Sequence, residues 1–202
     1  MKKVLIVAPH ADDAELGCGG VAQVLSRQDV KVSAMILGAP RGSEDVWIEE
    51  AKKANEVLNY GRLCLPQYPY MALQFHARTM EITKFIQTEV DQSDIDVVFC
   101  PARDDDHQDH QVVLEACRVA ACGKSLIGYI TPNRRTNVSP NWFVPITHQQ
   151  LNTKVEACHC YRRVRNSPYF ESAILRAQAQ FYGALCREPY AEGFIIEWLK
   201  GI

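Results

Sequence analysis

The sequence lacks any long apolar segment. Of its 202 residues 47% are hydrophobic, yet no run reaches the roughly 18 consecutive apolar residues of a membrane-spanning helix. Lys2 and Lys3 precede an apolar stretch at residues 4–8, but this stretch is too short for the apolar part of a secretion signal. We therefore expect a cytoplasmic protein without a membrane span.

An excess of positive charge is also missing, as are the usual nucleotide-binding glycine patterns. The formal net charge is -2, from 22 Lys and Arg against 24 Asp and Glu, so nothing indicates a nucleic acid or a membrane surface as partner. The order of Gly17, Gly19 and Gly20 fits neither the dinucleotide fingerprint nor the P-loop. A dinucleotide-dependent dehydrogenase is therefore disfavoured.

The eight cysteines include no Cys-x-x-Cys pair. A disulfide framework is typical of short secreted chains, which this is not. Cys100 ends an apolar run and Cys117 lies on a helical pattern, as is typical of small buried apolar residues. Cys158 and Cys160 flank His159, but side chains two positions apart do not share a helix face, so a zinc site there is disfavoured. We expect reduced cysteines.

Apolar runs alternate with amphipathic helical patterns over most of the chain. Strands are expected at residues 4–8, 30–37, 63–65, 95–100 and 126–130. Helices are expected at residues 21–25, 43–58, 77–90, 109–121, 149–161 and 171–185. Such alternation predicts a Rossmann-like α/β fold, with a mostly parallel sheet flanked by helices. The length suits a single domain spanning residues 1–202, in which the proline-punctuated residues 131–147 form a long loop and one wall of the pocket.

Polar residues directly follow the first expected strand. Ligands of open α/β sheets bind at the carboxyl ends of the strands, and His10, Asp12 and Asp13 stand at such an end. In a tight turn that enters a helix, His10 and Asp13 can point at one centre. An imidazole and a carboxylate suit zinc, which usually has three protein ligands and a water in catalytic sites. The sequence therefore predicts a third ligand elsewhere, with Asp12 as a spare carboxylate beside the water.

The same layout recurs after the strand expected at residues 95–100. Residues 103–110, RDDDHQDH, form a polar loop dense in His and Asp that leads into a helix. Alone, this loop could as well be a solvated acidic segment with two surface histidines. Because two such loops each follow an apolar strand, and the ends of parallel strands can meet over one site, we favour a shared metal centre.

These two motifs resemble those of a known family. PHADDAELGCGG and DDDHQDH are similar to the Pro-His-x-Asp-Asp and His-x-Asp-His motifs of the LmbE-like, or PIG-L, superfamily of zinc-dependent deacetylases. That family removes N-acetyl groups from amino sugars and related amides. Further similar positions extend the resemblance over nearly the whole chain; they are Glu50, Ala51, Ala54, Leu58, Lys154, Ala157, His159 and residues 190–194.

The resemblance implies a role for each matched residue. The ligands of Zn2+, or of Fe2+, would be His10, Asp13 and His110. Asp12 would be the general base, and His107 would polarise the carbonyl or stabilise the oxyanion. Asp109 would orient an imidazole.

The implied reaction is metal-assisted amide hydrolysis. A metal ion lowers the pKa of its bound water towards about 7, so that Asp12, a weak base, can take the proton and return it to the amide nitrogen. A protonated His107 would stabilise the tetrahedral oxygen, and Asp109 would raise the pKa of this imidazole.

The expected substrate pocket departs from the family. Trp47 stands where many relatives have Arg, and Tyr70 where many have Asp; both rings can stack on a sugar but cannot bind its hydroxyl groups as Arg and Asp do. With Arg41 and His159 they form a tentative set of substrate-binding residues. The substrate class that the resemblance implies is a small N-acylated amino sugar or its conjugate. Because of these two departures, we expect something other than the usual unadorned amino sugar, such as a nucleotide- or lipid-linked sugar, an antibiotic precursor or another amide.

Two alternative functions stay open at this point. The same metal site could hydrolyse another amide or an ester, or the chain could be a non-catalytic sugar-binding member of the family. Assembly into a homo-oligomer is also left open.

Overall fold

One mixed β-sheet organises the chain. The computed structural model describes residues 2–67, 69–135, 137, 139–161 and 166–200. Its eight strands follow the order β3-β2-β1-β5-β6-β8-β7, and β4 pairs with β2. In chain order the strands are β1 (Lys3–His10), β2 (Lys31–Ala39), β3 (Arg62–Cys64), β4 (Tyr70–Met71), β5 (Val97–Pro101), β6 (Ser125–Tyr129), β7 (Trp142–Pro145) and β8 (Ala191–Trp198).

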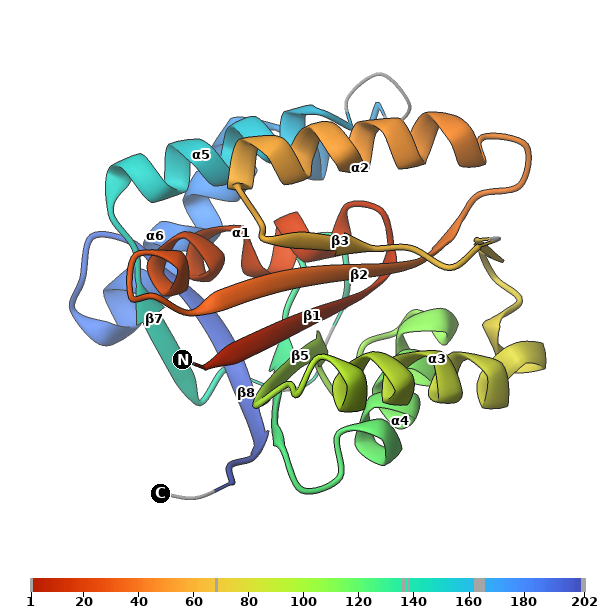
Figure 1. Cartoon of the computed structure of the whole chain (residues 1–202). Helices are drawn as coiled ribbons and strands as arrows, with labels where there is room; N and C mark the ends of the chain where they lie inside the picture. The colour runs from red at the N-terminus through yellow and green to blue at the C-terminus, as the bar shows by residue number, and fades with distance from the viewer. Residues whose placement is uncertain (1, 68, 136, 138, 162–165, 201–202) are drawn as a thin grey trace.

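Helices cover both faces of this sheet (Figure 1). One face packs against α1 (Asp13–Ser26), α2 (Glu44–Leu58), α5 (His148–His159) and α6 (Ser172–Cys186). The other packs against the short helix η1 (Phe75–Arg78), α3 (Thr79–Gln92) and α4 (Gln108–Ala120). A second short helix, η2 (Pro168–Phe170), precedes α6. The predicted α/β fold is confirmed.

β1 lies at the centre of this arrangement. It pairs in parallel with β2 on one side and β5 on the other. Val4 and Ile6 pack into the core beneath the α1 layer, whereas Leu5 and Val7 pack into the core beneath the α3 layer. A parallel strand covered on both faces requires an unbroken apolar run, which is why this strand is readable from sequence.

The C-terminal part of the sheet differs from the expectation. Residues 131–147 were expected as one long loop, but β7 lies within them and pairs antiparallel with β8, placing Phe143 opposite Gly193. β8 also pairs antiparallel with β6. β8 mixes glycine and two glutamates with its apolar residues, and β7 is a short edge strand that ends in Pro145, so neither carries a clear strand pattern.

The first helix begins at Asp13 rather than at residue 21, and the glycines lie inside it. A Cβ atom at Gly17 would lie 2.4 Å from the ring of Tyr129, and one at Gly20 would lie 2.9 Å from the carboxyl carbon of Glu192. The glycines therefore permit the close approach of Tyr129 and Glu192 to α1.

A buried ion pair packs into this helix. The Lys154 Nζ atom lies 2.6 Å from Glu192 Oε1 and donates to the Leu16 carbonyl at 2.8 Å. The N–H groups of Gly20 and Val21 donate to the Glu192 carboxylate at 2.9 and 2.6 Å. Both charged side chains are buried. Through this pair, α5 and β8 are bonded directly to α1.

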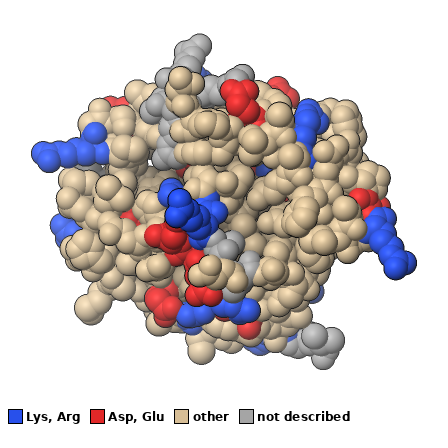
Figure 2. Space-filling model, turned by 180° about the vertical axis from the view of Figure 1, so that it is seen from behind, with Lys and Arg blue, Asp and Glu red and all other residues tan. Residues whose placement is uncertain are grey.

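No helix in the described part of the chain is long and apolar enough to cross a membrane. Figure 2 shows one face of the molecule, on which basic and acidic side chains lie interspersed. This mixture of signs agrees with the small net charge of -2.

Candidate metal centre

The loops that follow β1 and β5 meet at one edge of the sheet. β1 lies between β2 and β5, so the strand order reverses there, and such a switch point is where α/β sheets bind ligands. His10 ends β1 and Asp13 begins α1, while His110 lies in the first turn of α4, which follows β5 after the loop of residues 102–107. Neighbouring strand ends thus bring together side chains that are far apart in sequence.

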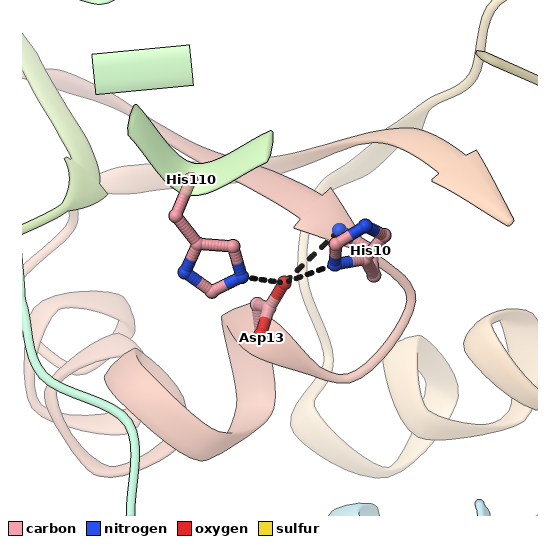
Figure 3. Close-up of side chains that lie close together, drawn as sticks. All are labelled: His10, Asp13 and His110. Atoms are coloured by element: carbon pink, nitrogen blue, oxygen red, sulfur yellow. Dashed lines mark hydrogen bonds and ion pairs between the residues drawn. The ribbon is translucent and has the colours of Figure 1, made fainter. Parts of the chain in front are cut away.

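His10, Asp13 and His110 converge on one point (Figure 3). Asp13 Oδ2 lies 3.3 Å from His10 Nδ1 and 3.2 Å from His110 Nε2. One nitrogen or oxygen from each residue lies within 4.8 Å of the others, and all three side chains are buried.

Two atoms in this cluster lack a hydrogen bond. Among the described residues, neither Asp13 Oδ1 nor His110 Nε2 has a hydrogen-bond partner, although His110 Nε2 lies within ion-pair distance of Asp13 Oδ2, at 3.2 Å. Buried polar atoms are rarely left in this way unless something else satisfies them. Two imidazoles and a carboxylate form a ligand set that zinc prefers, so the residues fit a divalent metal ion.

The second nitrogen of each imidazole lies against a carboxylate. His10 Nε2 is 3.1 Å from Asp109 Oδ2, and His110 Nδ1 is 2.8 Å from Asp105 Oδ2. A carboxylate that accepts one ring N–H fixes the tautomer and leaves the other nitrogen with its lone pair. Asp109 and Asp105 therefore orient His10 Nδ1 and His110 Nε2 towards the common point.

A second cluster of metal-ligating type, made of His10, His107 and Asp109, also has its atoms within 4.8 Å of one another. The Asp109 carboxylate is already engaged, because it accepts the N–H groups of Leu73 at 2.6 Å and Phe75 at 3.3 Å. We therefore favour the first cluster, in which Asp13 Oδ2 faces both imidazoles and His110 Nε2 has no hydrogen-bond partner among the described residues.

The electrostatics of the first cluster favour a bound cation. Although burial lowers it, the carboxylates of Asp13 and Asp105 raise the pKa of His110 to about 10. Burial raises the pKa of Asp13, but His110 and His10 hold it well below its ordinary value. Without a metal, the site therefore holds a proton on His110 at neutral pH, and a metal ion must displace it.

His107 differs from the expectation. It was expected to be protonated, with its pKa raised by Asp109. Burial and the charges of His10 and His110 instead lower its pKa to about 4, and the opposing effect of Asp109 is smaller. The backbone N–H of Asp109 donates to His107 Nδ1 at 3.1 Å, so the ring is neutral and carries its proton on Nε2, where it can still donate a hydrogen bond.

Asp105 and Arg134 were not identified from the sequence. Asp105 is the middle member of three consecutive aspartates; its acceptance of the His107 N–H at 2.9 Å is a short-range turn contact that this spacing permits. Arg134 lies in the β6–β7 connection, and its charge also lowers the pKa of His107. This connection is bonded to the acidic loop, because the Asp106 N–H donates to the Arg135 carbonyl at 3.2 Å.

Two of the expected substrate-binding residues are aromatic. Trp47 is 1% exposed, and its ring centroid lies 5.9 Å from that of Tyr161, so in this structure it is a packing residue rather than a surface for stacking. Tyr70 is half-buried, and its ring lies 5.9 Å from Phe75, whose ring is 5.7 Å from His10. Tyr70 is thus separated from the metal centre by one ring.

The other two lie on different sides. Arg41 is exposed in the turn after β2, near Gly38, which pairs with His10 across the sheet. His159 is half-buried at the end of α5, with its Nε2 atom 3.2 Å from Ser172 Oγ. Arg41 therefore shares the edge of the sheet that holds the metal centre, whereas His159 lies between α5 and α6.

Known proteins resemble the chain as follows. The family model of PIG-L, GlcNAc-PI de-N-acetylase, matches residues 5–121, which include both motifs. An uncharacterized deacetylase of Escherichia coli K12, YaiS, is 25% identical over 164 residues, which are 77% of this chain and 88% of the relative. The diacetylchitobiose deacetylase of Thermococcus kodakarensis is 26% identical over 232 residues, covering 100% of this chain and 85% of the relative.

Solved structures share the fold more widely than the chemistry. The 4-carboxy-2-hydroxymuconate hydratase GalB of Pseudomonas putida KT2440 matches with a TM-score of 0.81 at 17% identity, over 100% of this chain and 98% of that chain. Because one fold supports several reactions, function must be argued from the site.

Proposed function

Since the chain belongs to the PIG-L family of deacetylases, we propose that it is a metal-dependent hydrolase that removes an N-acetyl or similar N-acyl group from an amino sugar or its conjugate. The observation that carries this proposal is the convergence of His10, Asp13 and His110, each imidazole with its second nitrogen on a carboxylate. Zn2+ suits this ligand set best, and Fe2+ also accepts imidazole and carboxylate ligands.

The residues around the centre divide the reaction between them. When bound, the metal ion would supply an acidified water and a polarised substrate carbonyl. Asp12 directly precedes the ligand Asp13 and is 1% exposed. It would accept the proton of the attacking water and return it to the amide nitrogen as the C–N bond breaks. His107 would donate its Nε2–H to the oxygen that becomes negatively charged.

The substrate is recognised, in this proposal, by residues at the rim. Arg41 and Tyr70 lie at the same edge of the sheet as the metal centre and would contact the sugar, with His159 on the α5 side. Trp47 would contribute indirectly, because it is buried against Tyr161 and does not face the sugar. The diacetylchitobiose deacetylase among the relatives supports an N-acetylated sugar as the class of substrate.

Substitution of the general base tests the proposal. N-acetylated sugars and their conjugates, including N-acetylglucosamine and diacetylchitobiose, are first screened for release of acetate by the wild-type protein. On the best substrate, Asp12→Asn should reduce this release by about 100- to 10,000-fold, because a general base typically contributes that much. The bound metal should be retained. Asp106→Asn, at an exposed position of the second loop, is the matched control and should keep full activity.

The outcomes separate the alternatives. Unchanged turnover in Asp12→Asn would remove Asp12 as the base, and loss of the metal would make it a ligand instead. If the wild-type protein hydrolyses other amides or esters but releases no acetate from sugars, the proposed substrate is wrong and the proposed metal site stands. Saturable sugar binding without any turnover would favour the non-catalytic alternative.

A further inference from the structure

Leu73 has a backbone conformation that leucine rarely adopts. Its φ angle is 68°, in the left-handed region where a Cβ atom crowds the backbone. The residue is 59% exposed, so side-chain packing does not hold it in this conformation. Such strain persists only where the surroundings impose it, and it is concentrated at functional sites.

The turn bond from the Gln74 N–H to the Met71 carbonyl at 3.1 Å favours this conformation, and hydrogen bonds from the start of α4 stabilise it on both sides of Leu73. Gln108 Nε2 donates to the Leu73 carbonyl at 2.7 Å, and the Leu73 N–H donates to Asp109 Oδ2 at 2.6 Å. The Phe75 N–H donates to Asp109 Oδ1 at 3.3 Å. Gln108 and Asp109 are consecutive in the first turn of α4. The start of this helix therefore binds the turn between β4 and η1 through two adjacent side chains.

This turn bears on the metal centre through one carboxylate. Asp109 Oδ2, which accepts the Leu73 N–H, also lies 3.1 Å from His10 Nε2. The N–H groups of the turn direct the Asp109 carboxylate from one side, and the His10 ring meets it from the other. If the turn relaxed, Asp109 would lose the bonds that keep it facing His10.

We propose that Gln108 is a positioning residue for His10. By holding Leu73 in its left-handed conformation, Gln108 keeps the Leu73 and Phe75 N–H groups on Asp109, which in turn keeps His10 Nδ1 facing the metal. The inference rests on the proposed metal centre but not on the identity of the substrate.

The test uses the full-length protein and two readouts besides activity. The first is the Zn2+ affinity, measured by competition with a chromophoric chelator. The second is the rate at which the His10 Nε2–H proton exchanges with solvent in the zinc-loaded protein, measured by NMR. Removing a residue that directly supports a ligand costs about 10- to 100-fold in metal affinity, so Gln108→Ala, one contact further away, should cost about 3- to 10-fold. The proton exchange should become faster by a similar factor, since Asp109 is less firmly held.

Replacement of Leu73 shows whether the hydrogen bond from Gln108 acts by holding Leu73 in its strained backbone conformation. Leu73→Gly removes the penalty of the left-handed conformation, so adding Gln108→Ala should then cost less zinc affinity than it costs in the wild type. Leu73→Ala keeps a Cβ atom and the penalty, so Gln108→Ala should cost as much there as in the wild type. Gln74→Ala is the matched control, an exposed glutamine of the same turn at φ -128°, and should change neither readout.

Unchanged zinc affinity and proton exchange in Gln108→Ala would overturn the proposal, as would an equal effect of Gln108→Ala in all three Leu73 backgrounds. A protein that shows the expected effects but no deacetylase activity would count against the proposed function and leave the role of Gln108 standing. A wild-type protein that binds no zinc would overturn both.

Discussion

The two loops that form the candidate metal centre are held in place by different means. On the β1 side, every residue from 4 to 22 is buried, including His10 and Asp13. On the β5 side, residues 104–108 are mostly exposed or half-buried, and hydrogen bonds from Asp105, Asp109 and their neighbours fix the loop. The first loop is therefore set by the packing of the core, and the second by individual polar contacts that the buried Asp105 and Asp109 make beneath exposed neighbours.

This difference predicts which property a substitution changes. Changes among the buried residues that pack against α1 should lower the stability of the whole fold, since α1 and these residues belong to the core. Changes in the second loop should lower metal affinity while the protein stays folded, because few core contacts depend on them.

The largest effect, on the free energy of unfolding, is expected for the buried ion pair that packs against α1. Glu192→Leu leaves Lys154 as a buried charge without its carboxylate and deprives the Gly20 and Val21 N–H groups of their acceptor. Breaking a buried pair in this way costs about 3–5 kcal/mol of unfolding free energy, measurable by urea denaturation.

The control for this variant is Glu115→Leu. Glu115 forms an ion pair with Arg118 on the surface of α4, and its removal should change the unfolding free energy by less than about 1 kcal/mol. Equal destabilisation by the two variants would contradict the assignment of Glu192 to the support of α1.

A smaller effect, on metal affinity, is expected in the second loop. Asp105→Ala removes the carboxylate at His110 Nδ1, and Asp109→Ala removes the one at His10 Nε2. Each should lower the Zn2+ affinity by about 10- to 100-fold, because the imidazole loses the partner that orients it.

Asp104→Asn is the matched control for these variants. Asp104 is an exposed member of the same aspartate run, and its positive φ of 62° is tolerated by Asn. It should keep the wild-type affinity, and a variant at Asp105 that binds zinc as tightly as this control would argue against the orienting role.

The last expected effect, the smallest for each single step of the experiment, is a dependence of zinc affinity on pH that the two loops share. Asp13 from one loop and Asp105 from the other raise the pKa of His110 to about 10, against the effect of burial. Below that pH, zinc must displace a proton, so its apparent affinity should rise about tenfold per pH unit between pH 6.5 and 8.5. Chelator competition at three pH values measures the slope, and a flat profile would contradict the raised pKa.

The raised pKa of His110 also affects the stability of the metal-free protein, which should fall as the pH rises, whereas zinc affinity should increase. The folded pKa of His110 lies above its ordinary value of 6.5, so its protonation stabilises the folded state fully below about pH 6.5. This contribution is lost as the pH rises towards 10. Metal-free protein should therefore melt at a lower temperature at pH 9 than at pH 6.5, and an equal or higher melting temperature at pH 9 would contradict this contribution.

The sequence predicts the parallel half of the sheet well, because each central strand there is a short apolar run. Residues 4–8 and 95–100 correspond to β1 and β5, and the two polar motifs directly after them identify the loops that meet. β7 and β8 could not be read, since Gly193 and two glutamates interrupt the pattern of β8 and only pairing across the sheet makes these segments strands.

Within the site, the sequence identifies the residues of the two motifs more readily than the residues that hold the motifs in place. His10, Asp13 and His110 stand at fixed spacings after strands. Leu73 acts through its backbone, which leaves no trace in its residue type. The burial of Trp47 depends on Tyr161, far along the chain, and no local pattern reports such packing.

The central claim, that two loops share one metal ion, is tested most directly by metal content. Elemental analysis should find about one zinc or iron ion per chain in the wild-type protein, as three ligands from one site imply. The metal should be lost in His110→Ala and retained in His148→Ala, a change at an exposed histidine of α5. Equal metal content in wild type and His110→Ala, or no metal in the wild type even after incubation with zinc, would contradict the account.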